Sequence, residues 1–288
     1  MSKRTKQRIG LFLLLTLIFS TVFHVFLARQ GTLRSDGRLY AVGLMWSPGI
    51  AALLTQLLLQ GSIRGLGWRW GKTRYQLLSI LLPILLISVT YGVVWLTGLG
   101  GFPNEDFVVN NIESQLDFDA TRTQAILIYV AVSGLFGLIT TSFTALGEEI
   151  GWRGLLVPAL SKVTGFTGTA LISGIIWTLY HYPGILFTDY HSAAPMWYNL
   201  LCFTVMAVGF SIPMAWVRLK SGSVWTAMFL HASHNVFVQS IFTPLTFDTG
   251  PTEYVIDEFG VGLAVVYLIA GIVFWRMRDQ LPKEHVLR

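Results

Sequence analysis

The sequence predicts an all-α membrane protein in which about eight transmembrane helices surround a buried polar site. Of its 288 residues, 53% are apolar and only 12% are charged, a balance too apolar for a soluble domain of this length. The apolar residues form runs of about 20, the length that a helix needs to cross roughly 30 Å of hydrocarbon. Acids, histidines and an amide interrupt three of these runs, and ionisable groups inside membrane spans mark functional sites.

Eight runs are long enough to be spans, and no internal repeat or long linker divides them. We therefore expect a single integral-membrane domain over residues 1–288, with its functional motifs within residues 124–242. The first run is longer than the apolar part of a signal peptide and no small-residue cleavage site follows it, so we expect a helix there. The expected spans are 9–28, 40–59, 76–99, 124–160, 167–187, 196–217, 224–242 and 259–275.

The loops between the spans alternate between basic and acidic. Lys and Arg cluster at 3–8, 64–74, 218–220 and 276–278, whereas the loops at 100–123 and 243–258 are acidic. Excess Lys and Arg marks the cytoplasmic side, so we expect a multi-pass protein of the cell membrane with both termini cytoplasmic. The loop after the first span, which carries three arginines, is the one exception. Because the basic residues lie beside the spans, the net charge of +5 reflects membrane topology and does not indicate a nucleic-acid partner.

The fourth span continues past its acids, Glu148 and Glu149, and the first turn signal comes at residues 161–165. We therefore expect the fourth and fifth spans to form an antiparallel hairpin that turns near residue 163. Glu148 then lies about 15 residues from the turn and His181 about 18, or roughly 23 and 27 Å at 1.5 Å per residue. The two side chains are expected at nearly the same depth in the membrane.

Residue spacing within the helices indicates which side chains share a face. Glu149 and Arg153 are four residues apart, so they are expected to form an ion pair, while Glu148 points about 100° away. His231 and Asn235 are also four residues apart and are expected to face one cavity. His234 is interpreted as a packing residue.

This set of side chains predicts hydrolysis of an acyl bond. A buried carboxylate beside an imidazole can act as a general base, so Glu148 and His181 are expected to activate a water molecule. His231 and Asn235 would donate hydrogen bonds to the oxyanion of a tetrahedral intermediate. The supporting pair, Glu149 with Arg153, would fix the helix.

We expect no metal and no cofactor, but an alternative with zinc stays open. In that alternative Glu148, His181 and His231 would be the three ligands of zinc. The zinc motif His-Glu-x-x-His is absent, and the one cysteine, Cys202, excludes a cysteine-based zinc cluster.

Three segments resemble the motifs of a known family. Glu148 to Arg153, Trp177 to His181 and His231 to Asn235 follow the patterns Glu-Glu-x-x-x-Arg, aromatic-x-x-x-His and His-x-x-x-Asn, in that order. This arrangement is similar to the CAAX prenyl protease type II and bacteriocin-processing family (CPBP, or Abi) of intramembrane endopeptidases. The resemblance implies a glutamate-dependent endopeptidase that acts on a membrane-embedded or lipidated protein or peptide, prenylated in eukaryotic relatives. It implies the same roles for Glu148, His181, His231 and Asn235, although older descriptions of the family call its members metalloproteases.

Two other functions compete with this interpretation. In a proton-coupled transporter, Glu148, Glu149, His181 and His231 would form a proton relay. Transporters often contain internal repeats with paired broken helices, and this sequence shows none. A non-catalytic membrane scaffold or immunity protein would keep the same motifs for structure, and the complete catalytic set argues against it.

Overall fold

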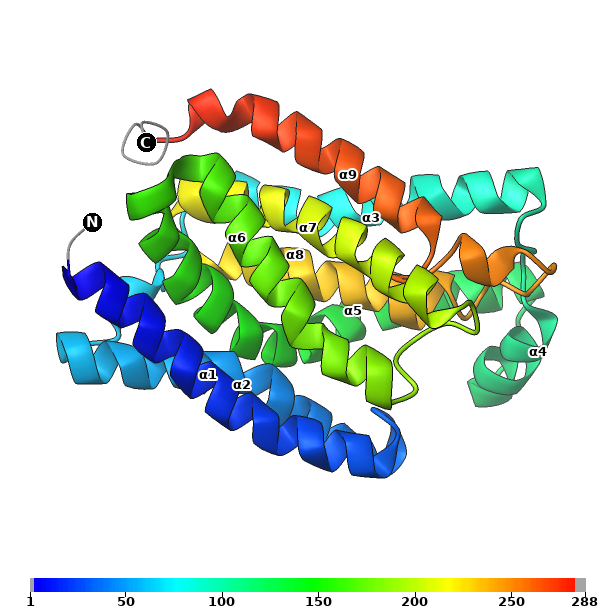
Figure 1. Cartoon of the computed structure of the whole chain (residues 1–288). Coiled ribbons are helices and arrows are strands. Elements are labelled where there is room, and N and C mark those ends of the chain that lie inside the picture. Colours follow the sequence, from blue (N-terminus) through cyan, green and yellow to red (C-terminus); the bar gives the residue numbers. More distant parts are fainter. Residues whose placement is uncertain (1–2, 283–288) are drawn as a thin grey trace.

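The computed structural model describes residues 3–282, and in that range the chain is helical, with one isolated β-bridge between Gly101 and Phe247 and no strands. Long helices lie side by side, in keeping with the predicted all-α membrane protein (Figure 1). The eight expected spans are all present as helical segments. Their bounds are α1 Lys3–Gln30, α2 Arg38–Gln60, α3 Thr73–Thr97, α5 Arg122–Glu149, α6 Val157–Phe187, α7 Met196–Ser221, α8 Val224–Asn235 and α9 Val261–Arg276.

Six of the described helical stretches are long and apolar enough to cross a membrane. One of them, Arg122–Phe187, holds both α5 and α6, joined by the π-helix Ile150–Leu156. The remaining segment is α8, which is short as an α-helix and continues as the π-helix Val236–Phe242. Helix α8 packs against α3, α5 and α7, so its surroundings are mostly protein.

The chain reverses direction at Gly165, which confirms the predicted hairpin. Gly165 has φ 65° and ψ −176°, a backbone conformation that side-chain-bearing residues avoid, and it interrupts the helical stretch of α6. The part of α6 after this glycine returns alongside the rest of the bundle (Figure 1). Residues 177–181 are thereby brought back to the level of the end of α5.

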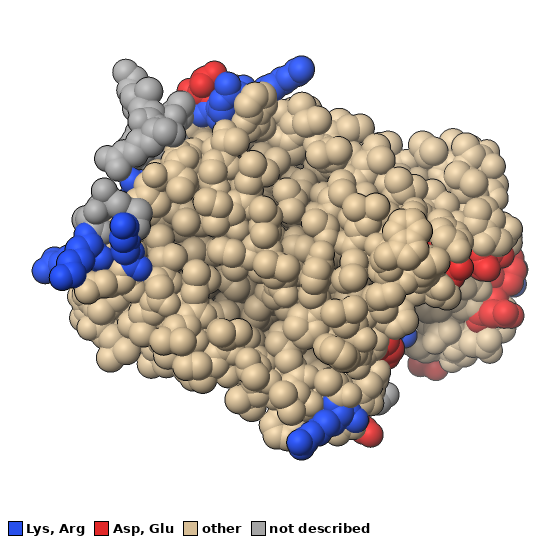
Figure 2. Space-filling model, in the orientation of Figure 1, with Lys and Arg blue, Asp and Glu red and all other residues tan. Residues whose placement is uncertain are grey.

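The outer surface of the bundle is apolar and its charges lie at the two ends. Large apolar side chains such as Leu96 and Leu127 are exposed at 90% and 63%, and a surface of this kind belongs in lipid. Figure 2 shows a broad uncharged area with Lys and Arg beside the first helix and acidic side chains at the opposite end. The two acidic loops meet through the Gly101–Phe247 bridge, at the end away from the start of α1 and the end of α9 (Figure 1).

Helices α2 and α5 touch through their backbones. A Cβ atom added to Gly49 would lie 2.4 Å from the carbonyl oxygen of Gly147, and one added to Gly151 would lie 2.5 Å from Pro48. No side chain fits at either crossing point. This glycine seam, formed by Gly49, Gly147 and Gly151, places α2 directly against the segment that carries Glu148.

Candidate active site

The two adjacent glutamates lie on the last turn of α5 and are both buried, with exposed fractions of 2% for Glu148 and 0% for Glu149. The helix changes there from α to π geometry, a local change that is frequent at functional sites. Because neighbouring residues on a helix point about 100° apart, the two carboxylates face different partners.

Glu148 is held by two tryptophans. Its Oε2 atom accepts hydrogen bonds from the indole nitrogens of Trp152, at 3.2 Å, and Trp177, at 2.9 Å. Within residues 3–282, no group donates a hydrogen bond to its other oxygen, Oε1. The carboxylate is therefore fixed in direction and keeps one oxygen for a molecule that enters the site.

Glu149 binds both a guanidinium and an imidazole. Its Oε1 atom lies 2.9 Å from Nη1 of Arg153 and 3.0 Å from Nδ1 of His231. The predicted ion pair with Arg153 is thus present, and Arg153 also donates to Ser211 at 3.3 Å. Its guanidinium lies 4.6 Å from the ring centre of Trp177, within the range of a cation–π contact.

His231 and Asn235 share a face of α8, but His231 has a partner that the sequence did not indicate. Its Nδ1 atom is used by Glu149, so only Nε2 is available to a substrate. Asn235 lies one turn later at the junction with the π-helix and is half-buried. In the described part of the chain its side-chain amide makes no hydrogen bond.

His181 is half-buried and does not bond Glu148 directly. Its Nδ1 atom lies 2.8 Å from the carbonyl oxygen of Trp177, one turn earlier on α6, which leaves Nε2 as its free nitrogen. The segment that carries His181 does lie at the depth of Glu148, as predicted, because Trp177 in the same segment bonds Glu148. The imidazole of His181 packs against the Trp177 ring at 5.3 Å, nearly perpendicular to it.

Trp177 contacts several residues of the candidate site at once. The sequence analysis did not identify Trp177 or Trp152 as site residues. The Trp177 indole contacts Glu148, Arg153 and both catalytic-candidate histidines, lying 5.5 Å from the His231 ring. Tryptophans in membrane proteins usually anchor helices at the interface, so composition alone gives no warning. One signal was available for Trp152: it lies four residues after Glu148 and so shares its helix face.

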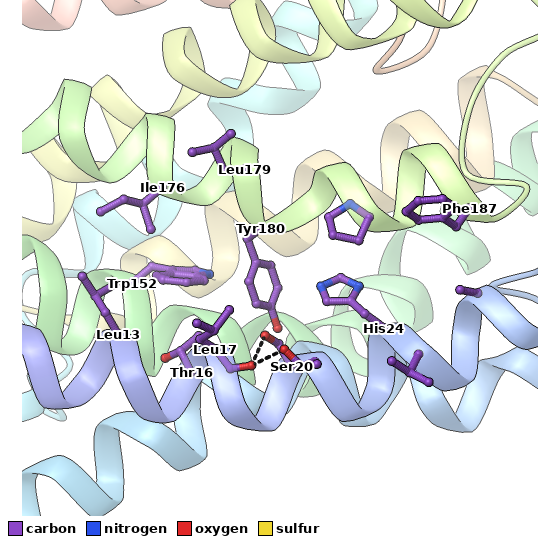
Figure 3. A pocket seen from close by; sticks show the side chains of 14 residues that line it. Leu13, Thr16, Leu17, Ser20, His24, Trp152, Ile176, Leu179, Tyr180 and Phe187 are labelled. Carbon is purple, nitrogen blue, oxygen red and sulfur yellow. Dashed lines mark hydrogen bonds between the residues drawn. The ribbon is translucent and has the colours of Figure 1, made fainter.

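A cavity of about 460 Å³ opens between α1 and α6 on the other side of Trp152 (Figure 3). Its lining is apolar, because the hydroxyls of Thr16 and Thr21 donate to carbonyls of their own helix. His24 also lines it, 5.6 Å from the ring of Tyr180. Since Trp152 also donates to Glu148, one side chain separates this cavity from the carboxylate.

The residues of the zinc alternative do not fit a metal site in this structure. Among residues 3–282, no three His, Cys, Asp or Glu side chains are close enough together to hold a metal ion. Glu148 is oriented by indoles instead of imidazoles.

The chain is similar to a known protein family over the part that carries the site. Residues 123–237 match the family model described as type II CAAX prenyl endopeptidase, Rce1-like. This range begins with α5 and ends just after Asn235, so it contains all three motifs and the elements that carry the site. No curated protein matches the chain.

Proposed function

We propose, from the premise that this chain belongs to the Rce1-like family of type II CAAX prenyl endopeptidases, that it hydrolyses a peptide bond in a membrane-embedded or lipidated protein by means of Glu148. The observation that carries this proposal is the Glu148 carboxylate, which two indoles fix by one oxygen while the other oxygen stays free. The apolar cavity behind Trp152 supports a substrate that reaches the site from the lipid.

The proposed reaction begins with a water molecule between Glu148 and His181. Oε1 of Glu148 takes a proton from this water as its oxygen attacks the carbonyl carbon of the substrate, and Glu148 then passes the proton to the leaving amine. Nε2 of His181 orients the water. All of these steps use groups whose other hydrogen-bonding atoms already have partners in the protein.

The oxyanion that forms during attack needs donors, and α8 supplies two. The Asn235 amide donates directly, and His231 donates from Nε2 when both of its nitrogens carry protons. The Glu149 carboxylate, 3.0 Å from Nδ1 of His231, compensates the charge of that imidazolium. Arg153 holds the Glu149 carboxylate in place, so this second acid is directed at Arg153 and His231 and away from the water.

The test is cleavage of a lipidated reporter peptide by the purified chain in detergent, with the products identified by mass spectrometry. Asn235→Ala is expected to lower kcat by about 100- to 1000-fold with little change in KM, because one oxyanion donor is lost. The matched control is Asn110→Ala, which removes an exposed amide in the acidic loop and should leave kcat unchanged. Failure of the wild-type chain to cleave any membrane-anchored reporter would contradict the proposal.

Metal independence is a second expected result. Because Glu148 and His181 activate water without a Lewis acid in this mechanism, a chelator should leave turnover intact, and the purified chain should lack stoichiometric zinc. The measurement is turnover before and after chelation, with elemental analysis of the same sample. Loss of activity that zinc restores would favour the metalloprotease alternative.

We also propose that both termini are cytoplasmic. Reporter fusions at residues 70 and 220 are expected to report the cytoplasm, and fusions at residues 110 and 250 the opposite side, because basic loops stay cytoplasmic. A cytoplasmic signal from residue 110 or 250 would reverse this assignment.

A further inference from the structure

A second buried polar cluster surrounds Glu258, in the loop before α9. Glu258 is only 3% exposed, and its carboxylate accepts hydrogen bonds from three side chains. These are His234 at 3.0 Å, Tyr190 at 2.5 Å and Gln239 at 3.2 and 3.1 Å to the two oxygens. In residues 3–282, no Lys or Arg forms an ion pair with it. One carboxylate thus links α8, the π-helix that follows α8, and the loop between α6 and α7.

His234 has both ring nitrogens occupied. Nε2 donates to Glu258 at 3.0 Å, and Nδ1 accepts from the hydroxyl of Tyr267, on α9, at 2.7 Å. The ring also packs against Phe210, with 5.0 Å between ring centres. A buried imidazole held in this way cannot turn without leaving at least two polar groups unsatisfied, which is costly.

The position of His234 on α8 connects its two hydrogen bonds to the candidate active site. His234 lies between His231 and Asn235 on the last turn of the helix, directly before the change to π geometry. Side-chain tips lie about 6 Å from a helix axis, so a rotation of about 10° would move them by about 1 Å. A displacement of that size in a catalytic group costs on the order of 100-fold in rate.

We propose that Glu258, through His234, is a positioning residue that fixes the rotation of α8 and so aims His231 and Asn235 at the substrate. This inference rests on the proposed function. Glu149 holds α8 from the side of α5 through His231, and Glu258 holds it from the side of α9 through His234. In residues 3–282, Glu258 forms no hydrogen bond or ion pair with Glu148 or Asn235.

The experiment is a double-mutant cycle between Glu258 and Asn235. Glu258→Gln keeps the volume but offers one acceptor oxygen to three donors, so α8 is expected to lose its fixed rotation. We expect kcat to fall by about tenfold or more with KM within about twofold. In the Asn235→Ala background the same substitution should lower kcat by about threefold or less, because one of the groups that it positions is already gone.

Two further variants separate positioning from stability. Tyr182→Phe removes a hydroxyl that bonds Thr204 at 2.8 Å, between α6 and α7, and should lower Tm without changing kcat. Tyr267→Phe keeps the Glu258 carboxylate and removes only the bond to Nδ1 of His234. It should reproduce the kcat pattern of Glu258→Gln even if that variant fails to fold.

The outcomes are distinct. A smaller effect in the Asn235→Ala background supports the inference, and equal effects in both backgrounds overturn it. This inference alone would be overturned if the wild-type chain turns over substrate and the Glu258→Gln and Tyr267→Phe variants have the same kcat as the wild type. A wild-type chain without turnover would overturn the proposed function and this inference with it.

Discussion

Glu148→Gln is expected to lower kcat by about 100-fold or more while the fold stays intact. The side-chain amide of glutamine has the same shape, and its carbonyl oxygen can still accept from the two indoles that hold Glu148 at 3.2 and 2.9 Å. What is lost is the basic oxygen that takes the proton from water. The measurement is turnover of a lipidated peptide together with Tm in detergent.

The matched control for this variant is Glu253→Gln, in the acidic loop that precedes α9 and five residues before Glu258. It makes the same chemical change and should keep wild-type kcat. Wild-type turnover in Glu148→Gln would end the proposed mechanism, whatever other variants did. A loss of kcat that is accompanied by a clear loss of stability, seen as a lower Tm, would instead show that the carboxylate is a structural group.

Arg153→Ala is expected to reduce both stability and rate. The arginine is fully buried and binds Glu149, Ser211 and the face of Trp177, so its removal leaves a buried carboxylate with only His231 as partner. Breaking a buried pair by removing one partner typically costs about 3–5 kcal/mol. The measurement is the free energy of unfolding in detergent, with exposed Arg64→Ala as the matched control.

A double variant shows whether the loss in Arg153→Ala comes from the uncompensated charge. Replacing the pair as Glu149→Gln with Arg153→Met removes both charges and should recover part of the stability, because neutral groups of similar size often replace buried pairs at little cost. The rate should stay low, since His231 has lost the carboxylate beside it. An Arg153→Ala variant as stable as the wild type would mean that the pair contributes nothing to the fold.

The parts of the structure that depend on short-range geometry could be predicted from the sequence. Span lengths follow from hydrocarbon thickness, and the turn near residue 163 follows from a glycine, Gly165, that can adopt a positive φ. The Glu149–Arg153 pair follows from the four-residue spacing, because such residues share a face whatever surrounds the helix.

Contacts between distant segments could not be predicted in the same way. The bond between His231 and Glu149 joins residues 82 positions apart, and it depends on how α5 and α8 rotate against each other. Glu258 looked like one more acid in an acidic loop, yet it is buried against His234. The sequence does not distinguish a tryptophan that donates to a carboxylate from one that anchors a helix in lipid. The role of Trp177 therefore depends on a contact between distant segments and could not be predicted either.

The glycine seam between α2 and α5 has a mechanical consequence. Where Gly49 meets Gly147, no layer of side chains lies between the helices that could slide or repack. Helices accommodate a thinner or thicker bilayer by tilting, and these two must tilt together. Glu148, the next residue after Gly147, keeps its place against α2 while its depth below the membrane surface changes. For the proposed reaction, we therefore expect the position of the bond cut along the substrate to change with the thickness of the bilayer that surrounds the chain.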